Sequence, residues 1–257
     1  MASLLIETGP VATVTLNRPE RHNAFDEQLI AELTLAFEDL GKDESVRVIL
    51  LAASGKSFSA GGDLNWMRRA AGYGRAENIA DAERLAAMLR SIDRCPKPTI
   101  ARVQGLALAG GTGLIACCDI AFAAEEAEFA ITEVRIGLVP AVIAPYLLRA
   151  IGARQMRRWA LTAARMSAPE AQRIGLVHGI VPAATLDGVI EAECQSLMQG
   201  SPAAQKAAKD LIRSVARPFD AGVIAETAER IADQRASEEG REGVAAFLEK
   251  RRPRWQR

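Results

Sequence analysis

The sequence has little histidine and cysteine, and their spacing argues against a metal site. Only two histidines occur among 257 residues, and the four cysteines are Cys95, Cys117, Cys118 and Cys194. No Cys-x-x-Cys pair is present, whereas zinc sites need three or four closely spaced Cys or His ligands. We therefore expect no metal, and buried free thiols that fit a reducing cytoplasm.

Excess charge and long apolar runs are also missing. The 32 basic and 32 acidic residues give a formal net charge of zero, whereas proteins that bind nucleic acids or membrane surfaces rely on positive charge. No apolar run reaches the ~18 residues of a membrane helix, and the first residues lack the pattern of a signal peptide. We expect a cytoplasmic protein without nucleic-acid or membrane partners.

Apolar residues, by contrast, make up 49% of the chain, which is typical of a globular protein with a large core. Alternating or β-branched runs predict strands at 11–16, 46–52, 99–103, 120–123 and 129–131. Helical spacing predicts helices at 26–40, 81–92, 113–118, 140–151, 202–215, 219–238 and 241–251. The alternation of strands and helices predicts an α/β core in residues 1–197 and a helical region in residues 198–257.

Two glycine clusters stand where an apolar, strand-like run gives way to a helical pattern. They are Ser59-Ala60-Gly61-Gly62-Asp63 and Ala109-Gly110-Gly111-Thr112-Gly113. A glycine has no side chain to keep a ligand oxygen from the backbone N–H. Two N–H groups that converge on one carbonyl would form an oxyanion hole, at roughly 3 kcal/mol per donor. The simpler interpretation is that each cluster only permits a tight turn.

Nucleotide-binding loops do not account for these clusters. Residues 105–112 have the spacing of a P-loop, but Gly111 stands where its lysine is required. Gly55-Lys56-Ser57 has the lysine and hydroxyl, but Leu50 stands where the first glycine is required. Neither cluster supplies the dinucleotide fingerprint near the first strand. A P-loop and a dinucleotide-binding loop are therefore rejected, and a tight turn stays the simpler interpretation of each cluster.

Six segments, in order along nearly the whole chain, resemble the crotonase family, the enoyl-CoA hydratase/isomerase superfamily. They are residues 17–24 (NRPERHNA), 58–64 (FSAGGDL), 96–105, 109–120, 129–137 and 247–251. The resemblance implies a ββα spiral core with a C-terminal helical trimerisation region, assembled as a homotrimer or homohexamer. It also implies an acyl-CoA thioester substrate and no separate cofactor, because the coenzyme A arrives with the substrate.

The resemblance assigns roles to the first cluster and to part of the second. Gly62 and Gly110 match the positions whose backbone N–H groups hold the thioester oxygen, in agreement with the glycine pattern. The backbone positions that hold the adenine and pantetheine parts of coenzyme A correspond to Ala60, Gly61 and Leu64.

Four further residues are candidates for the surroundings of the coenzyme. Asp63 lies in the same loop, where its side chain is expected to cap a helix rather than act as a base. Phe247 and Lys250 match positions near the CoA nucleotide, which a neighbouring subunit often contributes. Arg21 is a weaker candidate for a CoA phosphate.

The catalytic carboxylates depart from the family pattern. Family hydratases have two glutamates that flank one water, and the matching positions here are Gly113 and Glu133. The resemblance therefore implies a single general acid/base, Glu133. Partial burial would raise the pKa of Glu133 and suit proton transfer near neutral pH.

Three activities are compatible with one glutamate. Residues 62–69, 117–120 and 133–141 resemble bacterial methylglutaconyl-CoA and isohexenylglutaconyl-CoA hydratases, which favours hydration of a 2-enoyl-CoA. The terminal carboxylate of such a substrate would need a cation, for which Arg68 and Arg69 are candidates. The alternatives are an enoyl-CoA delta-isomerase, in which Glu133 moves one proton between C4 and C2, and a non-catalytic acyl-CoA binder.

Overall fold

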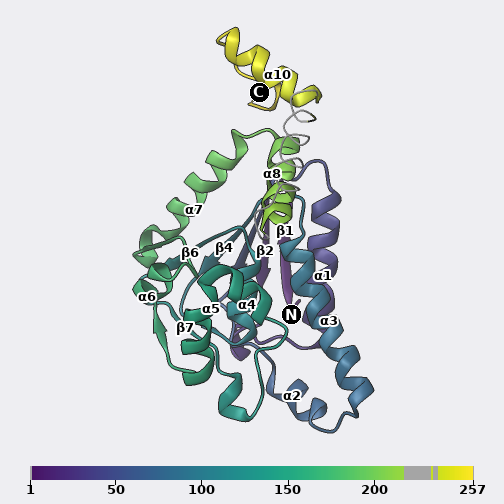
Figure 1. Ribbon diagram of the computed structural model, residues 1–257, viewed down its shortest axis with the longest axis vertical. Coiled ribbons are helices and arrows are strands. Elements are labelled where there is room, and N and C mark those ends of the chain that lie inside the picture. Colours follow the sequence, from purple (N-terminus) through teal and green to yellow (C-terminus); the bar gives the residue numbers. More distant parts are fainter. Residues whose placement is uncertain (1, 217–232, 234–236, 257) are drawn as a thin grey trace.

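The computed structural model describes residues 2–216, 233 and 237–256, and its side chains except those of residues 247, 248 and 256 (Figure 1). Most of the helix expected at 219–238 therefore lies outside the described residues. The rest is a mixed α/β structure, which confirms the expected fold class.

A six-stranded sheet forms the centre of the structure. Its order is β1 (Leu4–Glu7), β2 (Val11–Leu16), β3 (Val48–Ala53), β4 (Thr99–Val103), β6 (Ile120–Ala124) and β9 (Gly179–Val181). β1 is antiparallel to β2 and every other neighbour is parallel. Parallel strands need crossover helices, which is why both faces of this sheet are covered.

Alternate residues of β3 and β4 enter two separate apolar clusters. Val48 and Ile100 pack with α7 (Ala183–Met198) on one face, whereas Ile49 and Ala101 face the larger cluster on the other. This alternation follows from the two-residue repeat of a strand. The face with the larger cluster is covered by α1 (Glu27–Lys42), α3 (Arg75–Asp93), α4 (Gly110–Cys117) and α5 (Ala144–Thr162).

A second sheet of three short strands lies beside the first. β5 (Leu106–Leu108) pairs in parallel with β7 (Glu128–Ala130), which pairs antiparallel with β8 (Met166–Ser167). The short elements around it are η1 (Pro19–Arg21), α2 (Leu64–Ala70), η2 (Glu133–Ile136) and α6 (Ala168–Arg173). The carboxyl ends of β5 and β7 carry the turns described below.

The C-terminal elements are α8 (Pro202–Val215), α10 (Glu238–Leu248) and η3 (Arg254–Gln256). In Figure 1, α10 lies at one end of the long axis and α2 at the other. The predicted helical character of this region is confirmed where it is described, and the domain boundary at 197 stays a prediction. No helix among the described residues is long and apolar enough to cross a membrane.

Candidate active site

Three chain segments run side by side and end together. Ser59 forms a parallel bridge with Ala107 in β5, and Leu108 at the end of β5 is paired with Ala130 at the end of β7. Beyond these strands the chain enters the turns that contain Gly62, Gly110 and Glu133. Because carboxyl ends of parallel segments meet at one edge, the three residues that were expected to form the site are carried by adjacent turns.

The two glycine turns touch each other although about fifty residues separate them in sequence. A Cβ added to Gly61 would lie 3.0 Å from the carbonyl oxygen of Leu108 and 3.4 Å from the backbone nitrogen of Gly110. A Cβ on Gly111 would lie 2.6 Å from the carbonyl oxygen of Ser59. Gly61 also has φ +84, which side chains disfavour. Both clusters are therefore glycine-rich because their backbones pack closely.

Hydrogen bonds on either side of Gly62 determine the direction of its N–H. Phe25 donates its N–H to the Gly61 oxygen at 2.8 Å and accepts the N–H of Asp63 at 3.0 Å. In such a parallel bridge, the N–H and the C=O of the middle residue point to the side opposite the partner residue. The Gly62 N–H therefore points away from Phe25.

The Gly110 N–H is freed by a different device. Gly110 is the first residue of α4, where a helix leaves its N–H groups without internal acceptors. Ala109 before it adopts φ 48 and ψ −118 and donates its own N–H to the Ala130 oxygen at 2.8 Å. Such a backbone costs on the order of 1–3 kcal/mol and is typical of functional turns.

Neither the Gly62 N–H nor the Gly110 N–H has an acceptor in the described part of the chain. Gly110 begins α4, and Asp63, next to Gly62, caps the start of α2. Helix starts carry a partial positive charge that favours a negative oxygen. Two free donors on touching turns can therefore stabilise one developing oxyanion.

Glu133 is the first residue of η2, directly after β7. Its Oε2 is buried and has no hydrogen-bond partner within the described residues. Burial raises the pKa of this carboxyl above its ordinary value of 4.5, opposed by the backbone N–H groups of Glu133 and Thr132. A half-buried carboxyl with a raised pKa suits proton transfer near neutral pH.

Ile143 fills the space beside Gly113, the position of the second family glutamate. A Cβ on Gly113 would lie 2.4 Å from Cγ2 of Ile143 and 3.0 Å from its Cβ. Ile143 is itself 3% exposed and directly precedes α5. An apolar side chain therefore stands where a carboxylate at position 113 would have to pass, and Glu133 has no acidic partner from α4.

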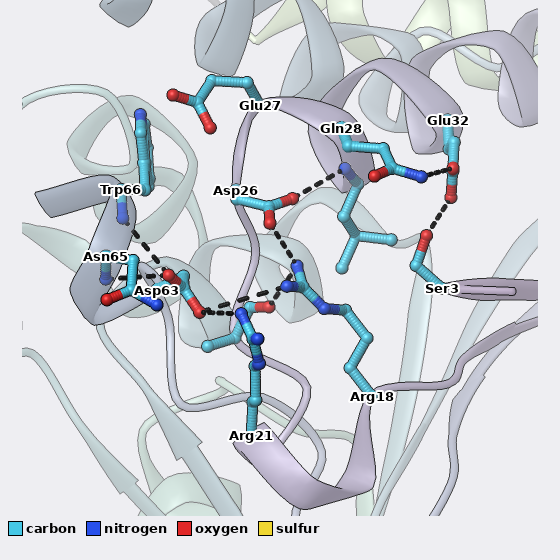
Figure 2. A network of polar contacts seen from close by, with 12 residues as sticks. Ser3, Arg18, Arg21, Asp26, Glu27, Gln28, Glu32, Asp63, Asn65 and Trp66 are labelled. Carbon is cyan, nitrogen blue, oxygen red and sulfur yellow. Dashed lines mark hydrogen bonds and ion pairs between the residues drawn. The ribbon is translucent and has the colours of Figure 1, made fainter. Parts of the chain in front are cut away.

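Asp63 holds its turn through several bonds, as Figure 2 shows. Its Oδ1 accepts the N–H groups of Asn65 and Trp66 at 2.8 and 3.2 Å, which confirms the expected helix cap. Burial opposes the charged form, but these N–H groups together with Arg21 outweigh it and lower the pKa of Asp63. Asp63 thus stays ionised and acts on the loop.

Arg18 connects this cap to the cap of the preceding helix. Its guanidinium lies 2.8 Å from Asp26, whose other oxygen accepts the N–H of Leu29 at the start of α1, and 4.0 Å from Asp63 (Figure 2). The Arg18 side chain is only 12% exposed. The resemblance drew attention to Arg21, which is 47% exposed, and missed Arg18.

The remaining candidates for coenzyme binding fall into two places. Leu64 is 73% exposed at the start of α2, and Arg21 lies 3.2 Å from Asp63, so both border the first turn. Ala60 is fixed nearby by its N–H, which donates to the His22 oxygen at 2.9 Å.

The C-terminal candidates are not brought to these turns within one chain. Lys250 follows α10, at the opposite end of the long axis from α2 (Figure 1). The side chain of Phe247 lies outside the described residues.

The two arginines considered for an acyl carboxylate have different partners. Arg69 forms an ion pair with Glu27 at 2.6 Å. Arg68 donates to the neutral amide oxygen of Asn65 at 2.7 Å and has no acidic partner among the described residues. Of these two guanidinium groups, only that of Arg68 has no carboxylate partner among the described residues.

Two hollows lie away from these turns. One of about 660 Å³ lies at the carboxyl ends of β3 and β4 and is lined by Lys56, Arg102, Gln104 and Asp187 among others. One of about 510 Å³ is lined by Cys117, Cys118, His178 and Lys209 among others. His178 accepts the N–H of Ala121 at 3.0 Å, which is a structural role. No cluster of three possible metal ligands occurs in the described residues.

Known proteins resemble this chain in sequence and in structure. The sequence pattern of the family described as enoyl-CoA hydratase/isomerase matches residues 7–257. The solved structure of an enoyl-CoA hydratase from Shewanella pealeana is 44% identical, with a TM-score of 0.96 over 99% of this chain and 96% of that one. An enoyl-CoA hydratase from Mycobacterium smegmatis is 37% identical, with a TM-score of 0.94 over the whole of both chains.

A third solved structure, AtuE from Pseudomonas aeruginosa, is 34% identical to this chain. Its TM-score is 0.95 over the whole of both chains. A match over almost the whole sequence, together with structures of this similarity, shows the relationship directly. The chain belongs to the enoyl-CoA hydratase/isomerase family.

Proposed function

We propose that this protein is an enoyl-CoA hydratase that adds water across the C2–C3 double bond of a 2-enoyl-CoA. The observation that supports the proposal is that two backbone N–H groups without acceptors, those of Gly62 and Gly110, lie on turns adjacent to the turn of Glu133, whose Oε2 is buried and has no partner in the described residues. Donors and acid lie on three adjacent turns. Each group is suited to a different step of the addition.

In the proposed reaction, ionised Glu133 takes a proton from water while the hydroxyl oxygen bonds to C3. The π electrons of the C2–C3 bond move toward the thioester, and the thioester carbonyl oxygen gains negative charge as an enolate forms. The N–H groups of Gly62 and Gly110 stabilise that charge. Glu133 then returns its proton to C2, which completes a syn addition and regenerates the carboxylate.

The coenzyme would lie along the first turn. Leu64 offers exposed apolar surface for pantetheine, and Arg21 is partly exposed beside the capped loop. Phe247 and Lys250 would contact the CoA nucleotide bound to a neighbouring subunit in a homotrimer or homohexamer. The distance between α10 and the glycine turns of the same chain agrees with this arrangement. No cofactor besides the coenzyme A of the substrate is required.

Within the hydratases, a branched glutaconyl-CoA substrate agrees with the sequence of the turns. Its terminal carboxylate would be bound by Arg68, which has no acidic partner in the described residues. The substrate carboxylate would then also help to orient the water that Glu133 alone must activate. A glutaconyl thioester is expected to react faster than a plain crotonyl thioester, and equal rates would contradict this substrate class.

An enoyl-CoA delta-isomerase is the second candidate, and one specific observation favours it. Because Ile143 fills the place beside Gly113, the site has one acid, which is sufficient to move a proton between C4 and C2. Water activation is not needed for that reaction.

One assay separates these activities. The protein is offered a 2-enoyl-CoA, a 3-enoyl-CoA and methylglutaconyl-CoA, and the absorbance of the conjugated thioester is followed. Loss of the 2-enoyl signal supports hydration, whereas a gain from the 3-enoyl substrate supports isomerisation. Binding without any absorbance change would reject both reactions.

A further inference from the structure

Phe25 contacts both glycine turns. Its backbone forms hydrogen bonds to Gly61 and Asp63, at 2.8 and 3.0 Å, on either side of Gly62. Its ring, 1% exposed, lies against Gly110, because a Cβ on Gly110 would be 2.2 Å from Cζ of Phe25 and 3.0 and 3.2 Å from its Cε atoms. Backbone and ring thus contact different turns.

The ring of Phe25 is supported from the side of the first turn. Its centroid lies 6.4 Å from that of Trp66, with the rings tilted by 49°. Trp66 packs under Gly62, since a Cβ there would lie 3.3 and 3.4 Å from two atoms of the indole ring. The two aromatic rings therefore form a continuous layer behind Gly62 and Gly110, at a separation typical of attractive aromatic pairs.

Hydrogen bonds fix the segment that carries Phe25. The Asn23 side chain donates to the oxygens of Ser54 and Ser57, each at 2.8 Å. The Ser59 hydroxyl donates to the Asn23 oxygen at 2.9 Å and accepts the N–H of Gly61 at 3.2 Å. Asp26 directly after Phe25 caps α1. The ring is therefore carried by a segment with little freedom to move.

We infer that Phe25 is a positioning residue that sets the separation of the two oxyanion donors. The inference rests on the proposed role of Gly62 and Gly110. The backbone of Phe25 fixes the first donor, and its ring, packed against Gly110, fixes the position of the start of α4 relative to the first turn. A smaller side chain would let Gly110 shift, and a donor stabilises the enolate only when it lies at hydrogen-bond distance from the oxyanion.

The first test compares Phe25→Leu with Phe37→Leu. Phe37 is equally buried at 1% but lies further along α1. Both variants should lose similar thermal stability. Phe25→Leu should lower kcat by about tenfold, as expected for a displaced donor, with KM and the Kd for free coenzyme A changed less than about twofold. Phe37→Leu should keep its kcat. Equal effects on kcat, or an effect of Phe25→Leu on KM alone, would overturn the inference.

A spectroscopic readout reports the donors directly. A conjugated aryl enoyl-CoA bound in a Glu133→Gln background should absorb at longer wavelength, because the two N–H groups polarise its carbonyl. Adding Phe25→Leu should reduce that red shift, and adding Phe37→Leu should leave it unchanged. A full red shift with leucine at position 25 would contradict the positioning role.

A compensating pair keeps the test informative should Phe25→Leu fold poorly. Gly110→Ala places a methyl group against the ring, whereas the smaller leucine leaves room for it. The double variant should therefore be more active than Gly110→Ala alone, and additive losses would count against the inference. A wild-type protein that neither turns over nor red-shifts an enoyl-CoA would refute the proposed function itself. Normal wild-type behaviour with a silent Phe25→Leu would refute only the role of Phe25.

Discussion

The glycine turns and the C-terminal helices are held in place by opposite means. At the turns, backbone meets backbone and buried rings, and a Cβ on Gly110 or Gly111 would overlap its neighbours. α8, in contrast, has no buried residue and attaches to the core through polar side chains such as Lys209, which lies 2.5 Å from Asp119. The proposed site therefore lies where close packing tolerates few substitutions, whereas we expect the C-terminal contacts to be individually replaceable.

The largest effect is expected where the turns carry the acid. Glu133→Gln should lower kcat by about 10²–10⁴, the usual contribution of a positioned proton donor or acceptor, because the amide cannot take a proton from water. The matched control is Glu128→Gln, since Glu128 is exposed and pairs only with Arg165 in the described residues. Steady-state kinetics with a 2-enoyl-CoA measures both. Comparable losses in the two variants would remove Glu133 from the mechanism.

The pH dependence of activity should reveal the burial of the same carboxyl. Burial raises the pKa of Glu133 above 4.5, and the ionised form is the one that accepts the proton of water. The acid limb of kcat/KM should therefore lie above pH 4.5 and fall about tenfold per pH unit below its midpoint. A limb at or below 4.5 would show that the carboxyl is solvated in the working enzyme.

The contribution of Glu133 to the stability of the fold should fall with rising pH, whereas activity should rise. A raised carboxyl pKa stabilises the fold below the unfolded pKa, and that contribution is lost as pH rises through the folded pKa. The difference in Tm between Glu133→Gln and wild type should therefore increase with pH and then level off. Thermal unfolding between pH 4 and pH 8 tests the sign.

Arg18 should contribute more to the free energy of unfolding than a cation in an exposed ion pair does. Arg18→Met leaves Asp26 and Asp63 near each other without their shared cation, and we expect a loss of about 3 kcal/mol in the free energy of unfolding. Arg165→Met is the control, because Arg165 and its partner Glu128 are both 49% exposed, and we expect about 0–1 kcal/mol there. Urea denaturation compares them, and similar losses would mean that the network contributes little.

Gly113 and Ile143 provide a direct test of packing. Gly113→Glu should destabilise the protein by about 1–3 kcal/mol, because the new side chain meets Ile143 at 2.4 Å. Combining it with Ile143→Ala should cost less than the sum of the two single losses. Additive losses in a denaturation cycle would show that the two positions do not share space.

The smallest effect on activity is expected in the C-terminal region. Lys209→Met removes the ion pair to Asp119 and a 2.9 Å bond to the Lys97 oxygen, at a cost of about 1 kcal/mol in stability. The value of kcat should stay within about twofold of wild type, since no step is assigned to Lys209. Lys206→Met, on the same helix but exposed, serves as the control. A loss of kcat with Lys209→Met would show that α8 influences the turns.

Sequence patterns predicted the long elements better than the short ones. β3 is buried on both faces, as its β-branched run indicates. The cap of α1 by Asp26 was also predicted from the sequence. α3 begins at Arg75 rather than 81. α5 covers Ala144–Thr162 rather than 140–151, but its non-helical residue Gly152, with φ 72, interrupts it directly after the predicted end. α6 and α7 were not predicted, although Ser167 before α6 and Pro169 in its first turn are typical of a helix start.

Within the site, sequence supplied residues but little of their contacts. The three adjacent turns depend on strands of three residues and on one-residue bridges at Ser59 and Phe25, which are too short for a periodic signal. Phe25, Arg18 and Ile143 were missed for the same reason, since each acts on residues distant in sequence. The one available signal was glycine itself at positions 110 and 113, since a glycine is often required where a bulky side chain packs against the backbone, as Phe25 and Ile143 do here.

The unusual backbone of Ala109 has a consequence for how a ligand would meet this surface. Because its left-handed φ of 48 is maintained by the bond to the Ala130 oxygen, the peptide plane that bears the Gly110 hydrogen is set before any thioester arrives. An incoming carbonyl would find that hydrogen already oriented, so its binding would not have to freeze a loose loop. The cost of that order is met during folding, once, instead of in every catalytic cycle.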